Sequence, residues 1–411
     1  MTTHYYDSLE TRDPEAREAN LFAALRDHLR AAMRAPAIAR LLAGTDPDAV
    51  TNRDALAGLP VIRKSELMAL QADSPPFGGL TSGAIEEFSN VFASPGPIFE
   101  PMPRRPDPFR MARALFAAGV RKGDLVHNTF SYHFTPAGAM LESGARAIGC
   151  TVFPAGVGQT ELQVQAIARL RPNAYVGTPS FLNILLDKAV ELDADVSSIT
   201  KGLVSGEALP PSLRAAIRER GVSVLQCYAV ADVGLIAYES PALEGMVLDE
   251  GVILEIVRPG TGDPVAEGEV GEIVVTPLNP DYPLVRFATG DLTAVMPGTS
   301  PCGRTNTRVR GWMGRADQTT KVRGMFVHPS QVAEVVRRHV EIVRARLVVT
   351  SVDNQDVMTL RCESGSDDPA IVGAIAGTVR DVCKLRGAIE IVEPGTLAND
   401  GKVIEDARTY E

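Results

Sequence analysis

The sequence predicts an α/β fold. A large N-terminal α/β domain with parallel sheets plus a β-subdomain is followed by a small, mobile C-terminal α+β domain. Between residues 124 and 225, short apolar runs alternate with helical segments, which is typical of βαβ units and a parallel sheet. Residues 252–276 contain two strand-like runs separated by a turn region rich in Gly, Pro and acidic residues, which favours an antiparallel β-subdomain. The segment after residue 316 has the length and element pattern of a compact domain. We therefore predict domains 1–316 and 317–411.

Composition restricts the classes of partner. The chain has 411 residues, of which 45% are hydrophobic and 22% charged, as in ordinary globular proteins. Its formal net charge is -10 and no dense Lys/Arg block offsets it, so a nucleic-acid-binding face is not expected. A local basic pocket for a phosphorylated ligand remains compatible with this charge.

Cysteine usage and the N-terminus predict a cytoplasmic protein. The five cysteines are odd in number and form no C-x-x-C pair, which favours a reducing compartment. The first residues form neither a basic nor an apolar leader segment, and no apolar run approaches the roughly 18 residues of a membrane span. No membrane partner is expected.

The N-terminal region is predicted to be helical and then irregular. In residues 14–43, apolar positions recur every four residues, and Pro36 should interrupt or end the helix. A further helix is expected near Ser65. Residues 89–108 are punctuated by Pro and Gly, which predicts a loop. Ser94 and Gly96 could donate to a phosphate, but the two prolines beside them remove donors, so this is a poor phosphate cradle.

The alternating region places polar residues after its strands. Strands are expected at 125–130, 151–153, 174–177, 202–204 and 222–225, and helices at 136–148, 161–170, 180–192 (N-capped by Ser180) and 211–219. In parallel sheets, functional residues follow the carboxyl ends of strands. Those loops carry Thr178, Ser205-Gly206-Glu207, and the segment from Tyr228 to Asp232. Glu207 could equally be a solvated loop carboxylate, and Tyr228 an aromatic plug.

Two further features lie in the second half of the chain. Asp291 stands between Gly290 and an expected strand at 292–295, where a carboxylate can hold the vicinal hydroxyls of a ribose. Gly-Asp before a strand is also an ordinary turn. The last domain is expected to contain helices 329–339 and 369–383 and strands 342–350, 357–362 and 388–392. It ends in a loop with Lys402, a position where lysine is usually only solvated.

Four signals occur in an informative order. They are Ser205-Gly206-Glu207, Tyr228 to Asp232, Arg286 to Asp291, and Gly314-Arg315-x-Asp317 followed by Arg323-Gly324. In this order the chain resembles the adenylate-forming superfamily, specifically its phenylacetate–CoA ligase branch, over nearly its whole length. The resemblance implies a carboxylate that attacks the α-phosphate of ATP, and a CoA thiol that then displaces AMP from the acyl-adenylate. ATP or AMP, Mg²⁺ and CoA are the implied ligands.

The resemblance also implies roles for individual residues. Ser205, Gly206 and Glu207 would line the adenine, with Tyr228 and Ala229 beside it. Asp232 would lie near Mg²⁺, Asp291 would hold the ribose, and Arg315 would lie near the ribose and phosphate. Asp317 would be the hinge of the small domain, and Lys402 would bridge the carboxylate and the α-phosphate. A small aromatic acid would bind near Thr178 and an aromatic cluster, in which Phe130 is better explained as core and Tyr132, His133 and Phe134 as pocket residues.

Three departures from the family pattern qualify these implications. The place of the phosphate-binding loop lacks its lysine and carries Glu100, whose charge would repel a polyphosphate. In the Tyr228 motif, Ala231 replaces a hydroxyl residue and Asp232 replaces a glutamate. Where relatives of this branch hold structural zinc, only Cys302 is kept, so no zinc site is expected.

Some alternatives stay open at this point. A homologue that binds a nucleotide or acyl group without adenylating it, and a ligase that uses an amine acceptor, both fit the altered loop. A serine hydrolase does not fit, because no G-x-S-x-G segment follows a strand. The sequence does not identify the acid or the oligomeric state, for which a homodimer is one option.

Overall fold

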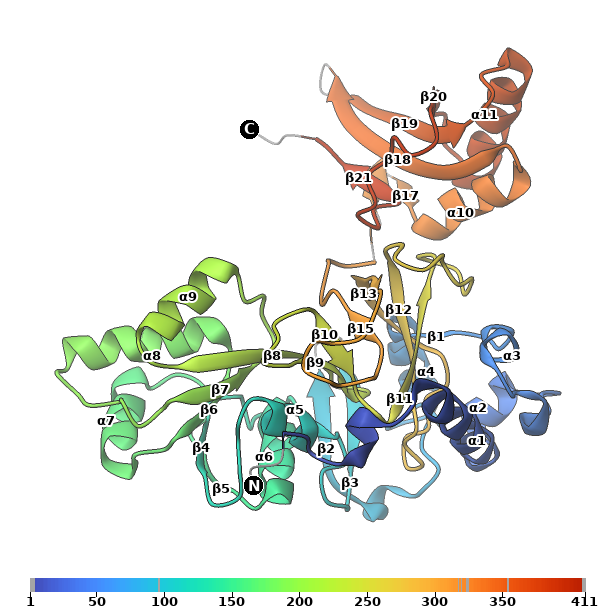
Figure 1. Ribbon diagram of the computed structural model, residues 1–411. Coiled ribbons are helices and arrows are strands. Elements are labelled where there is room, and N and C mark those ends of the chain that lie inside the picture. Colours follow the sequence, from blue (N-terminus) through green and yellow to red (C-terminus); the bar gives the residue numbers. More distant parts are fainter. Residues whose placement is uncertain are drawn as a thin grey trace. The chain divides into compact units, whose positions relative to one another are not determined.

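The computed structural model confirms the α/β fold class (Figure 1). It describes residues 4–94, 97–316, 318, 320–322, 325–352 and 355–408. Within these residues the chain forms two compact units. Unit 1 contains residues 1–254, 275–287 and 296–312, and unit 2 contains residues 255–274, 288–295 and 313–411. The predicted domain division at residues 316 and 317 stays a prediction.

The first elements are mainly helices of unit 1, of which α1 is the longest. Helix α1 (Pro14–Ala32) begins where the Asp13 carboxylate accepts the Ala16 N–H at 3.0 Å, and it buries Leu21, Leu25 and Leu29. Pro36 starts a new helix, α2, because proline is well suited to the first helical position. The elements that follow are α3 (Arg53–Ala57), β1 (Ile62–Arg63), the 3-10 helix η3 (Lys64–Glu66) and α4 (Leu67–Asp73).

The predicted parallel sheet is present. It comprises β4 (Leu125–Asn128), β5 (Thr151–Pro154), β6 (Ala174–Gly177), β7 (Lys201–Val204) and the first half of β8 (Ser223–Val230). The helices between them are α6 (Ala137–Ile148), α7 (Thr160–Leu170), α8 (Pro179–Glu191) and α9 (Pro211–Glu219). Strands β5, β4, β6, β7 and β8 are neighbours in that order and pair in parallel.

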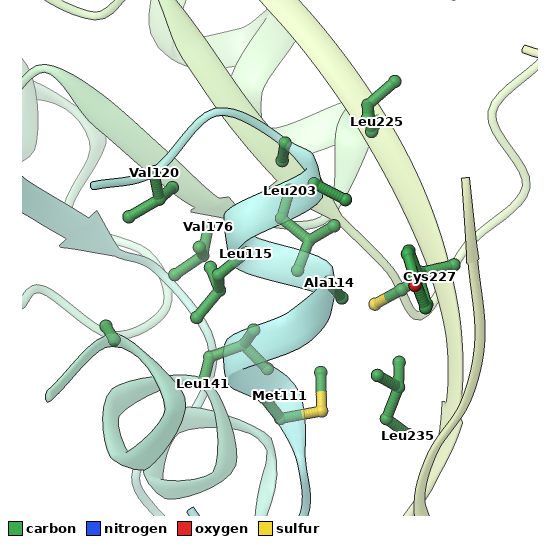
Figure 2. Packing of buried hydrophobic residues seen from close by; sticks show 14 of the residues in the cluster. Met111, Ala114, Leu115, Val120, Leu141, Val176, Leu203, Leu225, Cys227 and Leu235 are labelled. Atoms are coloured by element: carbon green, nitrogen blue, oxygen red, sulfur yellow. The ribbon is translucent and has the colours of Figure 1, made fainter. Parts of the chain in front are cut away.

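Helix α5 (Met111–Ala117) is the centre of the main core of unit 1, and all seven of its residues are buried. Figure 2 shows Met111, Ala114 and Leu115 packed among side chains from the neighbouring helix and strands. Gly144 of α6 permits the close contact between α5 and α6, because a Cβ there would lie 2.7 Å from the Ala112 nitrogen. This packing fixes the strands whose ends carry the candidate site.

Among the described residues, the loop that the sequence predicts at residues 89–108 is found mainly at residues 104–108, whereas residues 89–94 and 98–103 form strands. Strands β2 (Phe88–Ser94) and β3 (Ile98–Pro103) form an antiparallel hairpin, with Phe92 opposite Glu100 and Val91 opposite Pro101. The prolines misled the prediction, because a proline is tolerated at the edge of a sheet. The buried positions Phe88, Phe92 and Ile98 carry the strand signal instead.

Sheet β4–β8 continues in antiparallel strands. These are β9 (Gly234–Glu239), β10 (Met246–Leu248), β15 (Arg308–Val309) and β14 (Val295–Met296). A second sheet has the order β1-β13-β12-β11, with β11 (Val252–Val257), β12 (Gly271–Pro277) and β13 (Phe287–Thr293). The Arg286–Leu292 motif therefore lies almost entirely inside a strand, not before one as expected.

The last part of the chain forms a mixed sheet with two helices. The sheet has the order β20-β19-β18-β21, and a hairpin of β16 (Thr320–Val322) and β17 (Met325–Val327) precedes it. Its elements are α10 (Pro329–Arg338), β18 (Ile342–Val352), β19 (Gln355–Ser364), α11 (Pro369–Cys383), β20 (Ala388–Val392) and β21 (Ile404–Asp406). Across the described residues, none of the helices combines the length and apolar character that a bilayer span requires.

Candidate functional site

The loops with the predicted site residues of unit 1 share one edge of the parallel sheet. Asn128 pairs with Val176, and Gly177 pairs with Val204, so the chain leaves β4, β6 and β7 at the same level. Ligands of such sheets bind outside the carboxyl ends of the strands. Thr178, rather than Ser180 as predicted, caps α8, and its hydroxyl accepts the Phe181 N–H at 3.4 Å.

The Ser205-Gly206-Glu207 loop lies beside the loop that contains Thr178. A Cβ on Gly206 would lie 3.7 Å from Thr178 Cγ2 and 3.8 Å from Phe130 Cε1. Ser205 Oγ donates to Cys227 O at 2.9 Å, which ties the loop to β8. The Glu207 side chain is exposed, while its carbonyl accepts Gln226 Nε2 at 2.7 Å. The predicted nucleotide loop and one predicted acyl-pocket residue are therefore neighbours.

The aromatic residues after β4 divide between core and surface. Phe130 is buried in the main core, as expected. Tyr132 is partly buried, and Asn128 Nδ2 donates to its hydroxyl at 2.8 Å. Burial, and then the neighbouring Glu142, raise the pKa of Tyr132 above its usual value, so it stays a neutral phenol. His133 and Phe134 are exposed, and Phe134 is 81% exposed with a φ of 61°.

Strand β8 extends further than predicted and carries Tyr228 and Ala229. Tyr228 pairs with Ala237 of β9, and a bulge separates Tyr228 from Ala229. Asp232 follows in the turn between β8 and β9, where its side chain is fully buried. Its Oδ2 accepts a hydrogen bond from Lys64 Nζ at 2.5 Å. No site role for Lys64 is predicted from the sequence.

A second buried carboxyl group lies close to Asp232. Glu100 of β3 is 1% exposed, and its Oε2 accepts the Ser94 N–H at 3.2 Å. Burial, with a smaller contribution from Asp232, raises the pKa of Glu100 to about 8, although Ser94 and Lys64 partly oppose the shift. At neutral pH this carboxyl group is therefore mainly protonated. The charge repulsion expected from the sequence is suppressed until the group ionises.

Tyr282 completes this group, which sequence reasoning missed. Its hydroxyl is buried and has no hydrogen-bond partner among the described residues, and the same holds for Asp232 Oδ1. Burial raises the pKa of Tyr282 well above its usual value, and the charges of Asp232 and Glu100 add to the effect. The tyrosine stands in the turn-rich run before Arg286, where no motif marks it. We call Lys64, Ser94, Glu100, Asp232 and Tyr282 the buried polar cluster.

Unit 2 brings together Asp291 and Arg315. Arg315 Nη1 lies 2.9 Å from Asp291 Oδ1, and a Cβ on Gly290 would lie 2.8 Å from Arg315 Nη2. Glycine at 290, with φ 76°, therefore leaves room for the arginine. Arg315 and Lys402 line the same hollow of about 240 Å³. Two predicted nucleotide-binding residues, Asp291 and Arg315, and the predicted catalytic residue Lys402 thus lie near one another within unit 2.

Gly96 and Asp317, predicted for the phosphate loop and the hinge, lie outside the described residues. Their predicted roles stay predictions. Of the predicted phosphate-loop residues, Ser94 is buried at the end of β2 and its hydroxyl contacts Glu100 Oε1.

Asp232 can contribute to Mg²⁺ binding, but the described chain supplies no full set of ligands. No group of three or more His, Cys, Asp or Glu side chains among the described residues could hold a metal ion. Asp232 Oδ1 is a buried carboxylate oxygen that has no hydrogen-bond partner in the described part of the chain. Mg²⁺ is commonly bound by one or two carboxylates together with phosphate oxygens and water. Asp232 therefore fits an ion that arrives with a nucleotide.

In the segment where the resemblance would place zinc ligands, hydroxyl groups surround the thiol of Cys302. Ser300 Oγ lies 3.0 Å from Cys302 Sγ, and Arg304 Nη1 donates to the sulfur at 3.5 Å. Burial would raise the pKa of Cys302, but hydrogen bonds from Ser240, Ser300 and Arg304 outweigh it and lower the pKa to about 7. Hydroxyls are not among the usual ligands of zinc. The prediction that no zinc is bound remains open to metal analysis.

Cys302 is expected to react fastest with iodoacetamide at pH 7 in the folded protein. About half of this thiol should be ionised there, against a few per cent of an ordinary thiol, so the labelling rate should be about tenfold higher. Burial raises the pKa of the other four thiols and they are expected to stay unlabelled. Peptide mapping after timed labelling measures this order, with Cys302→Ser as the control. Equal labelling of Cys150 would contradict the expectation.

Comparisons with known proteins identify the family of the chain. The model of the AMP-binding enzyme family matches residues 111–277. A phenylacetate–coenzyme A ligase of Thermus thermophilus is 31% identical over 348 residues, which cover 80% of this chain and 77% of that protein. A phenylacetate–coenzyme A ligase of Pseudomonas putida is 32% identical over 311 residues, which cover 71% of this chain and 68% of that protein.

A solved structure is similar over almost the whole chain. The open conformation of 2-hydroxyisobutyryl-CoA ligase, in complex with 2-HIB-AMP and CoA, has a TM-score of 0.74 and 25% identity. The match covers 97% of this chain and 92% of that one. The fold similarity thus extends through both compact units.

Proposed function

The chain belongs to the AMP-forming acid–CoA ligases, in the phenylacetate–CoA ligase-like branch of the AMP-binding enzyme family, and on this premise we propose that it converts a small aromatic carboxylic acid into its CoA thioester. The reaction has two steps. A carboxylate oxygen forms a bond to the α-phosphorus of ATP while the bond to pyrophosphate breaks. The CoA sulfur then bonds to the acyl carbon, its proton is released, and AMP leaves.

The observation that carries the proposal is the grouping of Asp291, Arg315 and Lys402 in unit 2. Asp291 accepts the vicinal hydroxyls of the ribose, and the guanidinium of Arg315 holds the carboxylate in place at 2.9 Å. Lys402 lines the hollow that Arg315 also lines, so its ammonium group is available to the α-phosphate and the attacking carboxylate. Positioning with charge stabilisation is the main requirement of such a transfer.

The proposal also assigns roles to residues at the sheet edge of unit 1. Ser205-Gly206-Glu207 and Tyr228 border the adenine, and Asp232 would hold Mg²⁺. The ion neutralises phosphate charge when it is bound. Thr178 and Tyr132 border the aromatic acid, together with His133 and Phe134. The contact between Gly206 and Thr178 supports this assignment, because an acyl-adenylate needs its adenine and acyl sites to adjoin.

Coupled pyrophosphate release with a panel of acids tests the proposal. We expect release that depends on ATP and on an aryl acid, and an acyl-CoA product when CoA is present. Short-chain acids at equal concentration serve as the comparison for the aromatic preference, and simple amines replace CoA in a parallel series. A folded protein that releases no pyrophosphate with any acid would contradict the proposal. Amide formation without thioester formation would reassign the acceptor.

A further inference from the structure

The β2–β3 hairpin stands in the place of a phosphate-binding loop, and several backbone donors of its described residues are already paired. The Ala93 N–H donates to Phe134 O at 2.8 Å, and the Phe99 N–H donates to Gln71 Oε1 at 2.8 Å. Gln71 Nε2 donates back to Phe99 O at 2.8 Å, so α4 holds this edge of the hairpin firmly. Pro97 has no N–H. A loop binds phosphate through free backbone N–H groups, and those of Ala93 and Phe99 are engaged elsewhere.

Among the described residues, Ser94 supplies two further donors on this side, and both contact Glu100. The carboxyl group of Glu100 accepts the Ser94 N–H at 3.2 Å and also contacts the Ser94 hydroxyl. Both residues are more than nine-tenths buried. A carboxyl group offers the same kind of oxygen acceptors as a phosphate, so it can occupy the same donors. Glu100 thus lies where the outer phosphate of a nucleotide would have to compete for Ser94.

The charges around Glu100 make this position unfavourable for added phosphate charge. Asp232 is the facing carboxylate, and Tyr282 faces both acids with a neutral hydroxyl. The cation of the buried polar cluster is Lys64, whose Nζ is engaged with Asp232 at 2.5 Å. The cluster is close to neutral while Glu100 is protonated, and it gains a negative charge when Glu100 ionises.

We propose that the carboxyl group of Glu100 occupies the Ser94 donors that would otherwise bind the outer phosphates of ATP. As a result, the enzyme favours nucleoside monophosphates and acyl-adenylates over triphosphates. The inference rests on the proposed function, because it assumes that a nucleotide binds beside this hairpin. ATP is then held mainly through its AMP part. Glu100 is a specificity-determining residue and takes no part in the chemical steps.

Glu100→Met tests the occupancy, because methionine has a similar volume and no oxygen acceptor. In the full-length protein, wild type is expected to bind AMP at least as tightly as ATP by calorimetry. The variant should bind ATP about tenfold more tightly, the scale of one hydrogen bond to a charged group. Its affinity for AMP should change by less than about twofold on the same scale. The exposed Glu86→Gln change is the control and should leave both affinities unaltered.

Glu100→Gln tests whether the negative charge of ionised Glu100 opposes the use of ATP. Because the pKa of Glu100 is about 8, the group is neutral below that pH and ionised above it. The wild-type kcat/KM for ATP should therefore fall as the pH rises through about 8, and Glu100→Gln should lose this decline. CoA transfer from a preformed acyl-adenylate does not use the outer phosphates and should lack the decline in both proteins.

The outcomes of these experiments distinguish the proposed function from the proposed role of Glu100. If wild type neither binds AMP nor transfers an acyl group from acyl-adenylate to CoA, the proposed function fails. If it does both but Glu100→Met binds ATP no better, or worse, than wild type, the occupancy of the loop by Glu100 is wrong. An unchanged pH decline in Glu100→Gln overturns the charge argument in the same way.

Discussion

Replacing Lys402 with alanine is expected to lower kcat for acyl-adenylate formation by about 100-fold or more, the usual scale for removal of one electrostatic stabiliser. Hydrogen bonds to the backbone of Lys402 are consistent with such a role. Arg346, whose side chain is almost fully buried, donates from Nε to the Lys402 carbonyl at 3.1 Å, and the Lys402 N–H donates to Asp400 Oδ1 at 3.0 Å. The backbone is therefore held, while the side chain makes no hydrogen bond or ion pair in the described part of the chain.

The two half-reactions distinguish this role from a general loss of structure. Pyrophosphate release measures the first step, and transfer from a preformed acyl-adenylate to CoA measures the second. Lys402→Ala should impair the first step and leave the second within about threefold, because its charge acts on the α-phosphate during attack. Lys384→Ala is the matched control, since Lys384 is an exposed lysine of the same unit. Equal losses in both steps would show that Lys402 does not act in adenylation.

The parallel sheet could be predicted because its signals are local. Short apolar runs followed by amphipathic helices define β4 to β8, and helix α9 (Pro211–Glu219) has the predicted bounds because Pro211 stands at its first position. The carboxyl-end rule then placed Thr178 and Ser205 at one edge, which the strand register confirms. Topology of this kind follows from periodicity alone.

The buried polar cluster could not be predicted in the same way. Its members come from four separate parts of the chain, and each is unremarkable in its local sequence. Glu100 reads as a surface charge in a Pro-rich segment, whereas the hairpin turns it inward opposite Phe92. Tyr282 reads as a turn residue, and its burial against two acids depends on tertiary packing. Such groupings require the distances between distant segments.

Replacing Asp291 with alanine is expected to weaken AMP binding by about 30- to 100-fold, because two hydrogen bonds from ribose hydroxyls to a charged acceptor are lost. The Asp291 side chain is 10% exposed, and Arg315 Nη1 lies 2.9 Å from its Oδ1. The alanine variant also removes the ion pair with Arg315. Its midpoint of thermal unfolding is therefore measured beside calorimetric binding, so that a loss of affinity in a folded protein can be recognised.

A thermodynamic cycle that combines Asp291→Ala with a nucleotide lacking the ribose hydroxyls isolates the contact between Asp291 and the ribose. Dideoxy-AMP, which lacks both ribose hydroxyls, should bind wild type about as weakly as AMP binds Asp291→Ala. The variant should no longer distinguish the two nucleotides, because the partner of the hydroxyls is already gone, and the two changes will then be strongly non-additive. Additive losses would mean that the hydroxyls bind elsewhere and that Asp291 serves only to position Arg315. This result would also move the ribose away from β13, since Asp291 is the residue by which that strand is assigned to it.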